Sequence, residues 1–296
     1  MNYEWMVAAA IILRARWHKP GESRTTAGIC PLTRMSHLLI SVVVPVFLGE
    51  HTLPALVTEL ARAADRWESE RLPIKLVEVI FVDDGSRDGS AQVLAALQQQ
   101  HSWVRVITFA KNFGQHPATM AGIVQTCGDW IVTLDEDLQH HPKHIREMLA
   151  LAVRDGLDVV YARPSGSVHE SIFRDGTAHL CKALIAALTA NPRIRDFNSF
   201  RLIRGDTARA AAAAATGETY LDVALGWFSD RFGTHTVAMK DRRYIEKKCS
   251  GWTTRGLLSH ARRMLVSSLQ RKPVSFQIDR SKDALLRALI SRSLPS

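Results

Sequence analysis

The sequence has few of the features that mark secreted, membrane-spanning or zinc-finger proteins. Its four cysteines, Cys30, Cys127, Cys181 and Cys249, are scattered over 296 residues without a CxxC pair. That spacing indicates neither a structural zinc site nor a disulfide framework, and it predicts a reducing, cytoplasmic setting. The composition, 46% hydrophobic and 23% charged, is typical of an ordinary globular protein.

Long hydrophobic runs are also missing. The best apolar stretch near the N-terminus, WMVAAAIIL at residues 5–13, is much shorter than the ~20 residues that a membrane-spanning helix needs. It also lacks the preceding basic flank of a signal peptide. We therefore expect residues 1–37 to form a poorly ordered extension, with Met35 as an alternative start.

Acidic residues are scarce at the C-terminal end. Residues 38–239 carry a net charge of −4, whereas residues 240–296 carry +10. Such a basic segment predicts an anionic partner, either a membrane surface or nucleic acid; a solvated face without a partner is the alternative. Interleaved aromatic residues and known nucleic-acid motifs are lacking, so we expect no nucleic acid.

Apolar residues recur at helical spacing within this basic segment. They are Leu257, Leu258, Ala261, Met264, Leu265 and Leu269. A helix of this kind can lie among lipid headgroups, or the same stripe can pack against the sheet. The charges favour the first arrangement, which predicts a peripheral protein on the cytoplasmic, inner face of the cell membrane.

From His37 onward, valine-rich runs alternate with helical patterns. We predict strands at 38–46, 75–82, 104–109, 130–134 and 157–162, and helices at 53–70, 88–100, 116–127 and 142–156. The alternation predicts an α/β fold, a doubly wound and mostly parallel sheet with helices on both faces. No GxGxxG motif follows the first strand, which disfavours a dinucleotide-binding fold. In such sheets, ligands bind at the carboxyl ends of the strands.

Acidic residues follow the second predicted strand in the motif VDDGSRDGS. Turn formation and helix capping explain Gly85, Asp88 and Ser90. They do not require two adjacent acids, Asp83 and Asp84, at the strand end. We expect one of these to face the crevice and to accept hydrogen bonds from a nucleobase or a ribose.

The fourth predicted strand ends in LDEDLQHHP, where three carboxylates are consecutive. Like charges this close repel, so they require a shared cation or exposure to water. In an extended chain, Asp135 and Asp137 converge on one side and Glu136 points away. Together with Gln139, these oxygen ligands suit Mg²⁺ or Mn²⁺ that also binds substrate phosphates.

Two alternatives remain for this segment. The acids can instead complement the dipole of the following helix. The second alternative is a transition-metal site of histidine and carboxylate ligands, formed with His140, His141 and His144. Because no HExxH pattern is present, we expect these histidines to be rim or packing residues.

Taken together, SVVVPVF, VDDGSRDGS, KNFGQHPATMAGI and LDEDLQHHP resemble glycosyltransferase family 2, of GT-A fold. The nearest resemblance is to polyprenyl-phosphate glycosyltransferases of the dolichyl-phosphate mannose synthase kind. The resemblance covers residues 39–205, and a weaker one covers residues 240–265. It implies a GT-A domain at 38–239 and a basic, acceptor-side and membrane-proximal helical tail at 240–296.

The implied activity is a metal-dependent, inverting transfer. A sugar would move from a nucleoside-diphosphate sugar to an undecaprenyl-type polyprenyl phosphate in cell-envelope glycan synthesis. Such an acceptor, with a second pKa of about 6, is largely ionised at neutral pH and needs orientation more than a general base. A glycosyltransferase with a non-lipid acceptor, or a catalytically impaired nucleotide-sugar-binding homologue, is the alternative.

The resemblance also implies site residues. Those implied to bind the nucleotide sugar are Pro45, Glu50, Asp83, Asp84, Lys111, Asn112, Gly114, Asp135 and Gln139. The implied Mg²⁺ or Mn²⁺ ligands are Asp135, Asp137 and Gln139. The implied catalytic residues are Asp137, Asp196, Arg201 and Arg243. In this set Arg201 lies near the donor phosphates, Arg243 faces the lipid phosphate, and Asp196 is available if a base is needed. The family often has an aspartate where Ser199 stands and commonly an asparagine where Gly49 stands.

Overall fold

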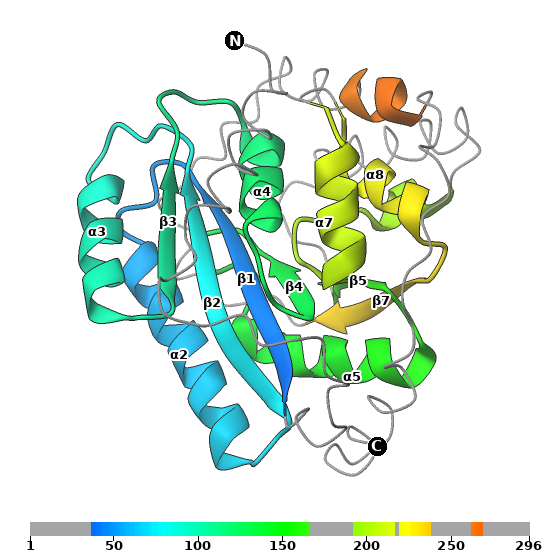
Figure 1. The fold of residues 1–296 in the computed structure, drawn as a ribbon, viewed down its shortest axis with the longest axis horizontal. Helices are drawn as coiled ribbons and strands as arrows, with labels where there is room; N and C mark the ends of the chain where they lie inside the picture. Colours follow the sequence, from blue (N-terminus) through cyan, green and yellow to red (C-terminus); the bar gives the residue numbers. More distant parts are fainter. Residues whose placement is uncertain (1–36, 166–191, 217–218, 238–261, 269–296) are drawn as a thin grey trace, which may run out of the picture.

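The computed structural model describes residues 37–165, 192–216, 219–237 and 262–268. Within these ranges, seven strands form one sheet in the order β3-β2-β1-β4-β6-β5-β7 (Figure 1). The strands are β1 (Leu38–Val46), β2 (Ile74–Asp83), β3 (Val104–Thr108), β4 (Trp130–Thr133), β5 (Val159–Pro164), β6 (Arg201–Arg204) and β7 (Phe232–Val237). Neighbouring strands run parallel except at β6, which is antiparallel to both β4 and β5. The predicted mostly parallel α/β sheet is confirmed, and the reversed β6 is an addition to it.

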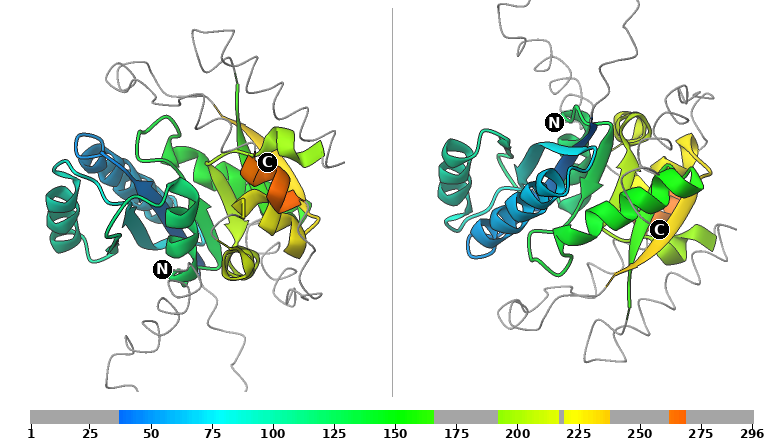
Figure 2. Two further views of the ribbon diagram at one scale, coloured as in Figure 1. Left: turned by 90° about the horizontal axis from the view of Figure 1, so that it is seen from above. Right: turned by 90° about the horizontal axis from the view of Figure 1, so that it is seen from below.

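Helices cover both faces of the sheet (Figure 2). One layer holds α2 (Leu53–Ser69), α3 (Ser90–Gln100) and α5 (Ile145–Asp155). The other holds α4 (Gln115–Val124), α7 (Gly205–Ala214) and α8 (Leu221–Phe228). Two short 3₁₀ turns, η1 (Pro142–His144) and η2 (Pro192–Asp196), complete the described elements. No helix in the described ranges has the length and apolar character needed to cross a bilayer.

The central strand β1 is buried on both faces. Val42 and Val44 point into the core beneath α2 and α5, whereas Val43 points into the core beneath α4 and α7. A strand covered on both sides needs apolar residues at every position, which explains its continuous valine run. The parallel arrangement of β1 to β4 then brings their carboxyl ends to one edge.

Backbone hydrogen bonds join the loops at that edge. The amide of Asp84 donates to the carbonyl of Val46 at 2.9 Å, and the amide of Phe109 donates to the carbonyl of Asp83 at 2.8 Å. The chain leaving each strand is therefore held against its neighbour. All four polar segments predicted from the sequence lie along this one edge.

One stretch of the basic C-terminal segment is described, a short helix at residues 262–268. Met264 is 5% exposed and belongs to the core beneath α7 and α8, and the Ser267 hydroxyl accepts from the amide of Tyr220 at 2.7 Å. This helix begins with the basic residues Arg262 and Arg263. Part of the predicted stripe therefore packs on the domain. The other predicted positions, Leu257, Leu258, Ala261 and Leu269, lie outside the described residues, as do residues 1–36 and Arg243.

Candidate functional site

The carboxylate of Asp84 shapes the loop that follows β3. Asp84 is 2% exposed, and its two oxygens accept the backbone amides of Phe113 and Gly114, each at 2.7 Å. Burial raises the pKa of this carboxyl despite the two hydrogen bonds. Gly114 has a φ of 97°, a conformation that favours glycine, and it stands directly before α4. The contact of Asp84 with a nucleotide stays a prediction.

Its neighbour Asp83 is also buried, at 1% exposed. It accepts the amide of Ser86 at 3.0 Å and so closes the turn after β2. Asp88 accepts the amide of Ser90 at 3.1 Å just before α3, in agreement with the expected turn role, whereas the N-cap of the helix is Gly89 and not Asp88 or Ser90. Both adjacent acids of the motif thus lie below the surface of the rim.

The loops after β1 and β2 are tied together by Glu50. Its carboxylate accepts the amide of Gly89, and its own amide donates to Asp88 at 3.3 Å. The hydroxyl of Ser90 accepts the amide of Gly49 at 3.0 Å, a contact between loops that the motif alone did not indicate. Pro45 is buried in β1 opposite Val82.

Exposed apolar side chains lie on the same rim. Phe47 and Leu48 follow β1 and are 42% and 46% exposed, and Leu48 has a φ of 58°. Phe113 is 36% exposed, and the ammonium group of Lys111 lies 5.2 Å from its ring centroid. Together with the exposed Asn112, this loop offers cationic, polar and apolar groups to a ligand.

The half-buried Asp135 joins three parts of the chain. Its Oδ1 accepts the Gln115 side-chain amide at 2.5 Å, and its Oδ2 accepts the Ser199 hydroxyl at 2.7 Å. Gln115 begins α4 and Ser199 precedes β6, so the reversed strand supplies one of the two contacts. Both of these donors are neutral groups.

The rest of the carboxylate loop, residues 134–141, has a defined turn. Oδ1 of Asp137 accepts the amide of Gln139 at 3.1 Å, and the intervening Leu138 is buried with a φ of 61°. Glu136 lies against Gly49, because a Cβ on that glycine would stand 3.0 Å from its Cγ. Asp135, Asp137 and Gln139 are half-buried, and their oxygen donors fit a hard cation such as Mg²⁺ or Mn²⁺.

The histidines of this segment differ in their surroundings. His140 is 7% exposed and packs 5.2 Å from the ring of Phe200, and burial lowers its pKa to about 4. It is therefore neutral at pH 7 and packs as expected. His141 Nε2 lies 3.1 Å from the carboxylate of Glu59 on α2.

Arg201 belongs to a buried polar network. It is 3% exposed, its guanidinium pairs with Asp222 on α8, and its Nε donates to the Thr133 hydroxyl at 2.8 Å. The Tyr161 hydroxyl donates to the same Asp222 oxygen at 2.9 Å. A direct contact of Arg201 with donor phosphates requires this pair to rearrange and stays a prediction.

Asp222 was not among the residues predicted from the sequence. The available signal was a single acid in the otherwise apolar helix LDVALGWF, where an unpaired charge would be costly. Asp196, the predicted reserve base, forms an ion pair with Arg163 and its side chain is 30% exposed.

Similarity to known proteins points to the same family as the sequence motifs. Residues 41–205 match the family model of glycosyl transferase family 2. The chain is 33% identical over 215 residues to an undecaprenyl-phosphate 4-deoxy-4-formamido-L-arabinose transferase of Proteus mirabilis. It is 31% identical over 217 residues to the protein of the same name from Yersinia enterocolitica. The matches cover 71% of this chain but only 63% and 62% of those relatives.

Solved structures agree on the fold. Glucosyl-3-phosphoglycerate synthase of Mycobacterium tuberculosis superposes with a TM-score of 0.53 at 18% identity, over 86% of this chain and 85% of that one. The same enzyme in complex with Mn²⁺, UDP-glucose and phosphoglyceric acid gives 0.51 at 18% identity, over 85% of each chain. At this identity the likeness establishes the GT-A fold. The family model covers more than half of the chain, and the chain therefore belongs to glycosyl transferase family 2.

Proposed function

We propose that this chain is a metal-dependent, inverting glycosyltransferase that moves a sugar from a nucleoside-diphosphate sugar to an undecaprenyl-type polyprenyl phosphate. Cell-envelope glycan synthesis is the setting. The observation that carries the proposal is Asp135, held by Gln115 and Ser199 at the carboxyl end of β4, in a loop where Asp137 and Gln139 add oxygen donors. The names of the Proteus and Yersinia relatives support the acceptor. The complex of the mycobacterial enzyme supports a nucleotide-sugar donor and Mn²⁺.

The donor would lie along the rim formed by β1 to β4. Asp135, Asp137 and Gln139 would hold Mg²⁺ or Mn²⁺, which when bound neutralises the negative charge that develops on the leaving diphosphate. Pro45, Glu50 and Asp83 would lie beneath the base and ribose. Asp84 would act by holding the loop of Lys111, Asn112 and Gly114 in place for the donor, because both its oxygens serve that loop.

The acceptor side needs little proton chemistry. An oxygen of the ionised lipid phosphate bonds to the anomeric carbon from the side opposite the diphosphate, which leaves with the bonding electrons, so the configuration inverts. With Ser199 donating to Asp135 and Asp196 paired with Arg163, these two positions do not offer a free carboxylate base. This favours a phosphate acceptor over a hydroxyl acceptor, since a hydroxyl must lose a proton as it attacks.

A panel of nucleoside-diphosphate sugars tests the proposal. Release of nucleoside diphosphate is measured with and without undecaprenyl phosphate, and with Mg²⁺, Mn²⁺ or chelator. We expect release from one donor only when both the lipid phosphate and a divalent cation are present. Release that is independent of the lipid would indicate a non-lipid acceptor. Donor binding without release from any donor would indicate the impaired homologue.

The place of action is a further part of the proposal. We infer a peripheral position on an anionic, inner membrane face, supported by the net charge of +10 in residues 240–296. On the described helix at 262–268, Leu265 and Val266 are exposed while Met264 is buried. An apolar face next to cations is the arrangement that suits a headgroup layer.

A further inference from the structure

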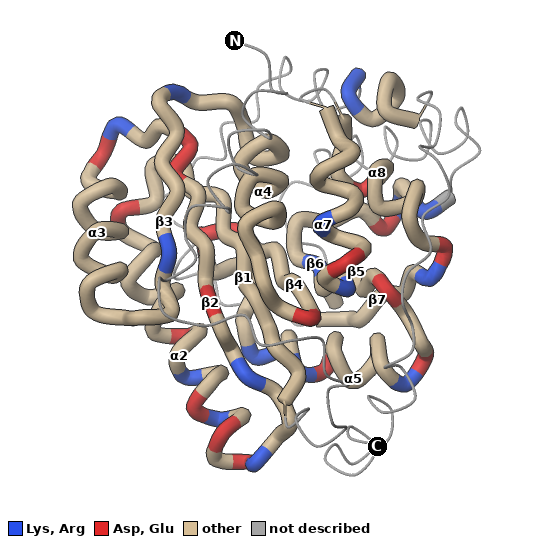
Figure 3. The backbone as a smooth tube through the Cα atoms, viewed as in Figure 1, with Lys and Arg blue, Asp and Glu red and all other residues tan. Residues whose placement is uncertain are grey.

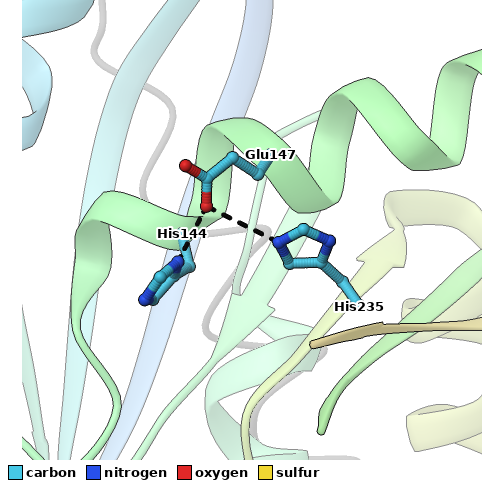
Figure 4. Close-up of side chains that lie close together, drawn as sticks. All are labelled: His144, Glu147 and His235. Atoms are coloured by element: carbon cyan, nitrogen blue, oxygen red, sulfur yellow. Dashed lines mark hydrogen bonds and ion pairs between the residues drawn. The ribbon is translucent and has the colours of Figure 1, made fainter. Parts of the chain in front are cut away.

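Three metal-ligating side chains gather at the start of α5, outside the proposed reaction (Figure 4). Nδ1 of His144 lies 2.7 Å from Oε2 of Glu147, and Nε2 of His235 lies 3.5 Å from the same oxygen. One ligand atom from each residue falls within 4.8 Å of the other two. Both rings therefore face a single carboxylate oxygen.

The fold assembles this cluster from two distant parts of the chain. His144 ends η1 and Glu147 follows three residues later in α5, a spacing that places both on one side of the helix. His235 lies on β7, paired in register with Ala162 of β5, and α5 packs against β7. The third ligand comes from an edge strand that no local pattern connects to α5.

The three ligand atoms of this cluster favour particular metal ions. Two imidazole nitrogens and one carboxylate oxygen are ligands of Zn²⁺ and other late first-row divalent cations, whereas Mg²⁺ prefers oxygen ligands. Three protein ligands leave one position for water. The set thus differs from the all-oxygen set of the carboxylate loop.

Burial and access also suit an ion. The side chain of His144 is 9% exposed, that of His235 is 27% exposed and that of Glu147 is 50% exposed. One ligand is thus anchored in the interior, and two can be reached from solvent. Nε2 of His144 is buried and has no hydrogen-bond partner among the described residues, so the contact of Nδ1 with Glu147 is what orients the ring.

We propose that His144, Glu147 and His235 form a binding site for Zn²⁺ or another late first-row divalent cation, separate from the metal ligands of the carboxylate loop. The ion would join the start of α5 to the edge strand β7. Because η1 directly follows the carboxylate loop, it would also tie down the end of that loop. Binding is expected to stabilise the folded chain, since the ligands are brought together only by folding.

Cobalt titration of the metal-depleted full chain tests this site. Co²⁺ binding is followed by the visible absorption of the four-coordinate ion, and Zn²⁺ is added in competition. We expect His235→Gln and Glu147→Gln to weaken Co²⁺ binding at least about tenfold, the lower bound seen even when residues outside the ligand shell are changed. Zn²⁺ should raise the Tm of the wild type more than that of either variant.

Two control variants separate this site from other metal binding. His101→Gln removes a histidine that contacts Trp103 at the far end of α3, and it should bind Co²⁺ like the wild type. Asp137→Asn should also keep the site, and the readout needs neither donor nor turnover, so it is independent of the proposed function. Absence of Co²⁺ binding in the wild type, or equal affinity in His235→Gln and the wild type, overturns the proposal. His235 and Glu147 are partly exposed, so we expect both variants to fold, and circular dichroism verifies this.

Discussion

Acidic residues on the rim divide into two groups by burial. Asp83 and Asp84 are almost fully buried, and backbone amides donate to both oxygens of Asp84 and to one oxygen of Asp83. Asp135 and Asp137 are half-buried on a loop whose turn places Leu138 inside. Residues of one type, in neighbouring loops, thus have different tasks. The buried pair builds the rim, and the half-buried pair is accessible to a cation.

Asp137→Asn tests the accessible pair. Removing one charged ligand should lower turnover by about 10²–10³-fold, or about 3–4 kcal/mol of transition-state stabilisation, with the Tm little changed. Diphosphate release and thermal unfolding measure the two quantities. Glu136→Gln is the matched control, since it removes the neighbouring charge from a side chain that packs against Gly49. Near-normal turnover of Asp137→Asn would refute the metal assignment.

Asp84→Asn tests the buried pair. An amide side chain has one acceptor oxygen for the two amides of Phe113 and Gly114, so one buried N–H loses its partner. We expect the free energy of unfolding to fall by about 1–3 kcal/mol, measured by urea denaturation. Asp206→Asn, an exposed change on α7, should have an effect within about 0.5 kcal/mol. Equal stability of the two variants would show that Asp84 does not hold the loop.

At the level of elements, α4 approaches the sheet very closely. A Cβ on Gly122 would lie 2.4 Å from Val43 Cγ1 and 3.1 Å from Val82 Cγ2. These atoms belong to the neighbouring strands β1 and β2 and cannot move freely, so glycine is required where the helix crosses them. The approach positions Gln115, at the other end of α4, next to Asp135.

Gly122→Ala should therefore destabilise the fold by about 1–3 kcal/mol through overpacking. Gly226→Ala is the matched control, because a Cβ on that α8 residue meets no atom of the described residues within 4 Å. The control should be stabilised by about 0.5–1 kcal/mol, the usual gain of alanine over glycine in a helix. Chemical denaturation of both variants gives the comparison, and equal shifts would contradict the packing argument.

Glu78 connects three elements at the other end of the sheet. Its carboxylate accepts from the Ser41 hydroxyl at 2.7 Å, from Arg105 at 2.5 Å and from the amide of Cys127 at 2.7 Å. Burial alone would raise the pKa of Glu78, but these hydrogen bonds outweigh it and hold the pKa below its ordinary value of 4.5. The ionised form thus stabilises the folded state.

The sign of this shift predicts a pH dependence. A carboxyl with a lowered folded pKa stabilises the protein above its ordinary pKa of 4.5, and that contribution is lost as the pH falls through the folded pKa. Glu78→Gln should cost about 2 kcal/mol at pH 7, and the difference from the wild type should shrink below pH 4.5. Urea denaturation across this range measures it. A difference that is constant with pH would show that the charge has no part in it.

On the scale of the whole molecule, charge is distributed unevenly. The described domain carries both signs along its backbone, as Figure 3 shows, while residues 240–296 hold most of the excess positive charge. Each basic residue near an anionic leaflet contributes about 1 kcal/mol. A lipid-phosphate acceptor lies in such a leaflet, so one surface would serve both location and access to substrate.

Vesicle sedimentation tests that surface. We expect the chain to pellet with anionic vesicles and not with neutral ones. At 1 M salt, where the Debye length is about 3 Å, part of the bound chain should be released. Truncation after Ser268 removes a net charge of +4 and keeps Met264 and Ser267, which contact the domain. Its binding should be weaker while its fold is retained. Equal binding of both forms, or equal partition to neutral vesicles, would contradict a basic membrane surface.

The sequence by itself determined the sheet and the main part of the rim. Burial on both faces requires apolar residues throughout β1, and the alternation with helices requires parallel neighbours, so these features are visible locally. The four motifs likewise indicated the family, because their residues resemble those of glycosyltransferase family 2. That resemblance is local and needs no knowledge of long-range contacts.

The tertiary structure alone decided which distant residues meet. It placed the reversed β6 beside β4, so that Ser199 reaches Asp135, and it paired Arg201 with Asp222 of α8. It also brought His235 of β7 to His144 and Glu147. These partners are far apart in the chain and share no periodic pattern. The order of the strands and the packing of the helices on the sheet bring them together, and both are set over the whole core.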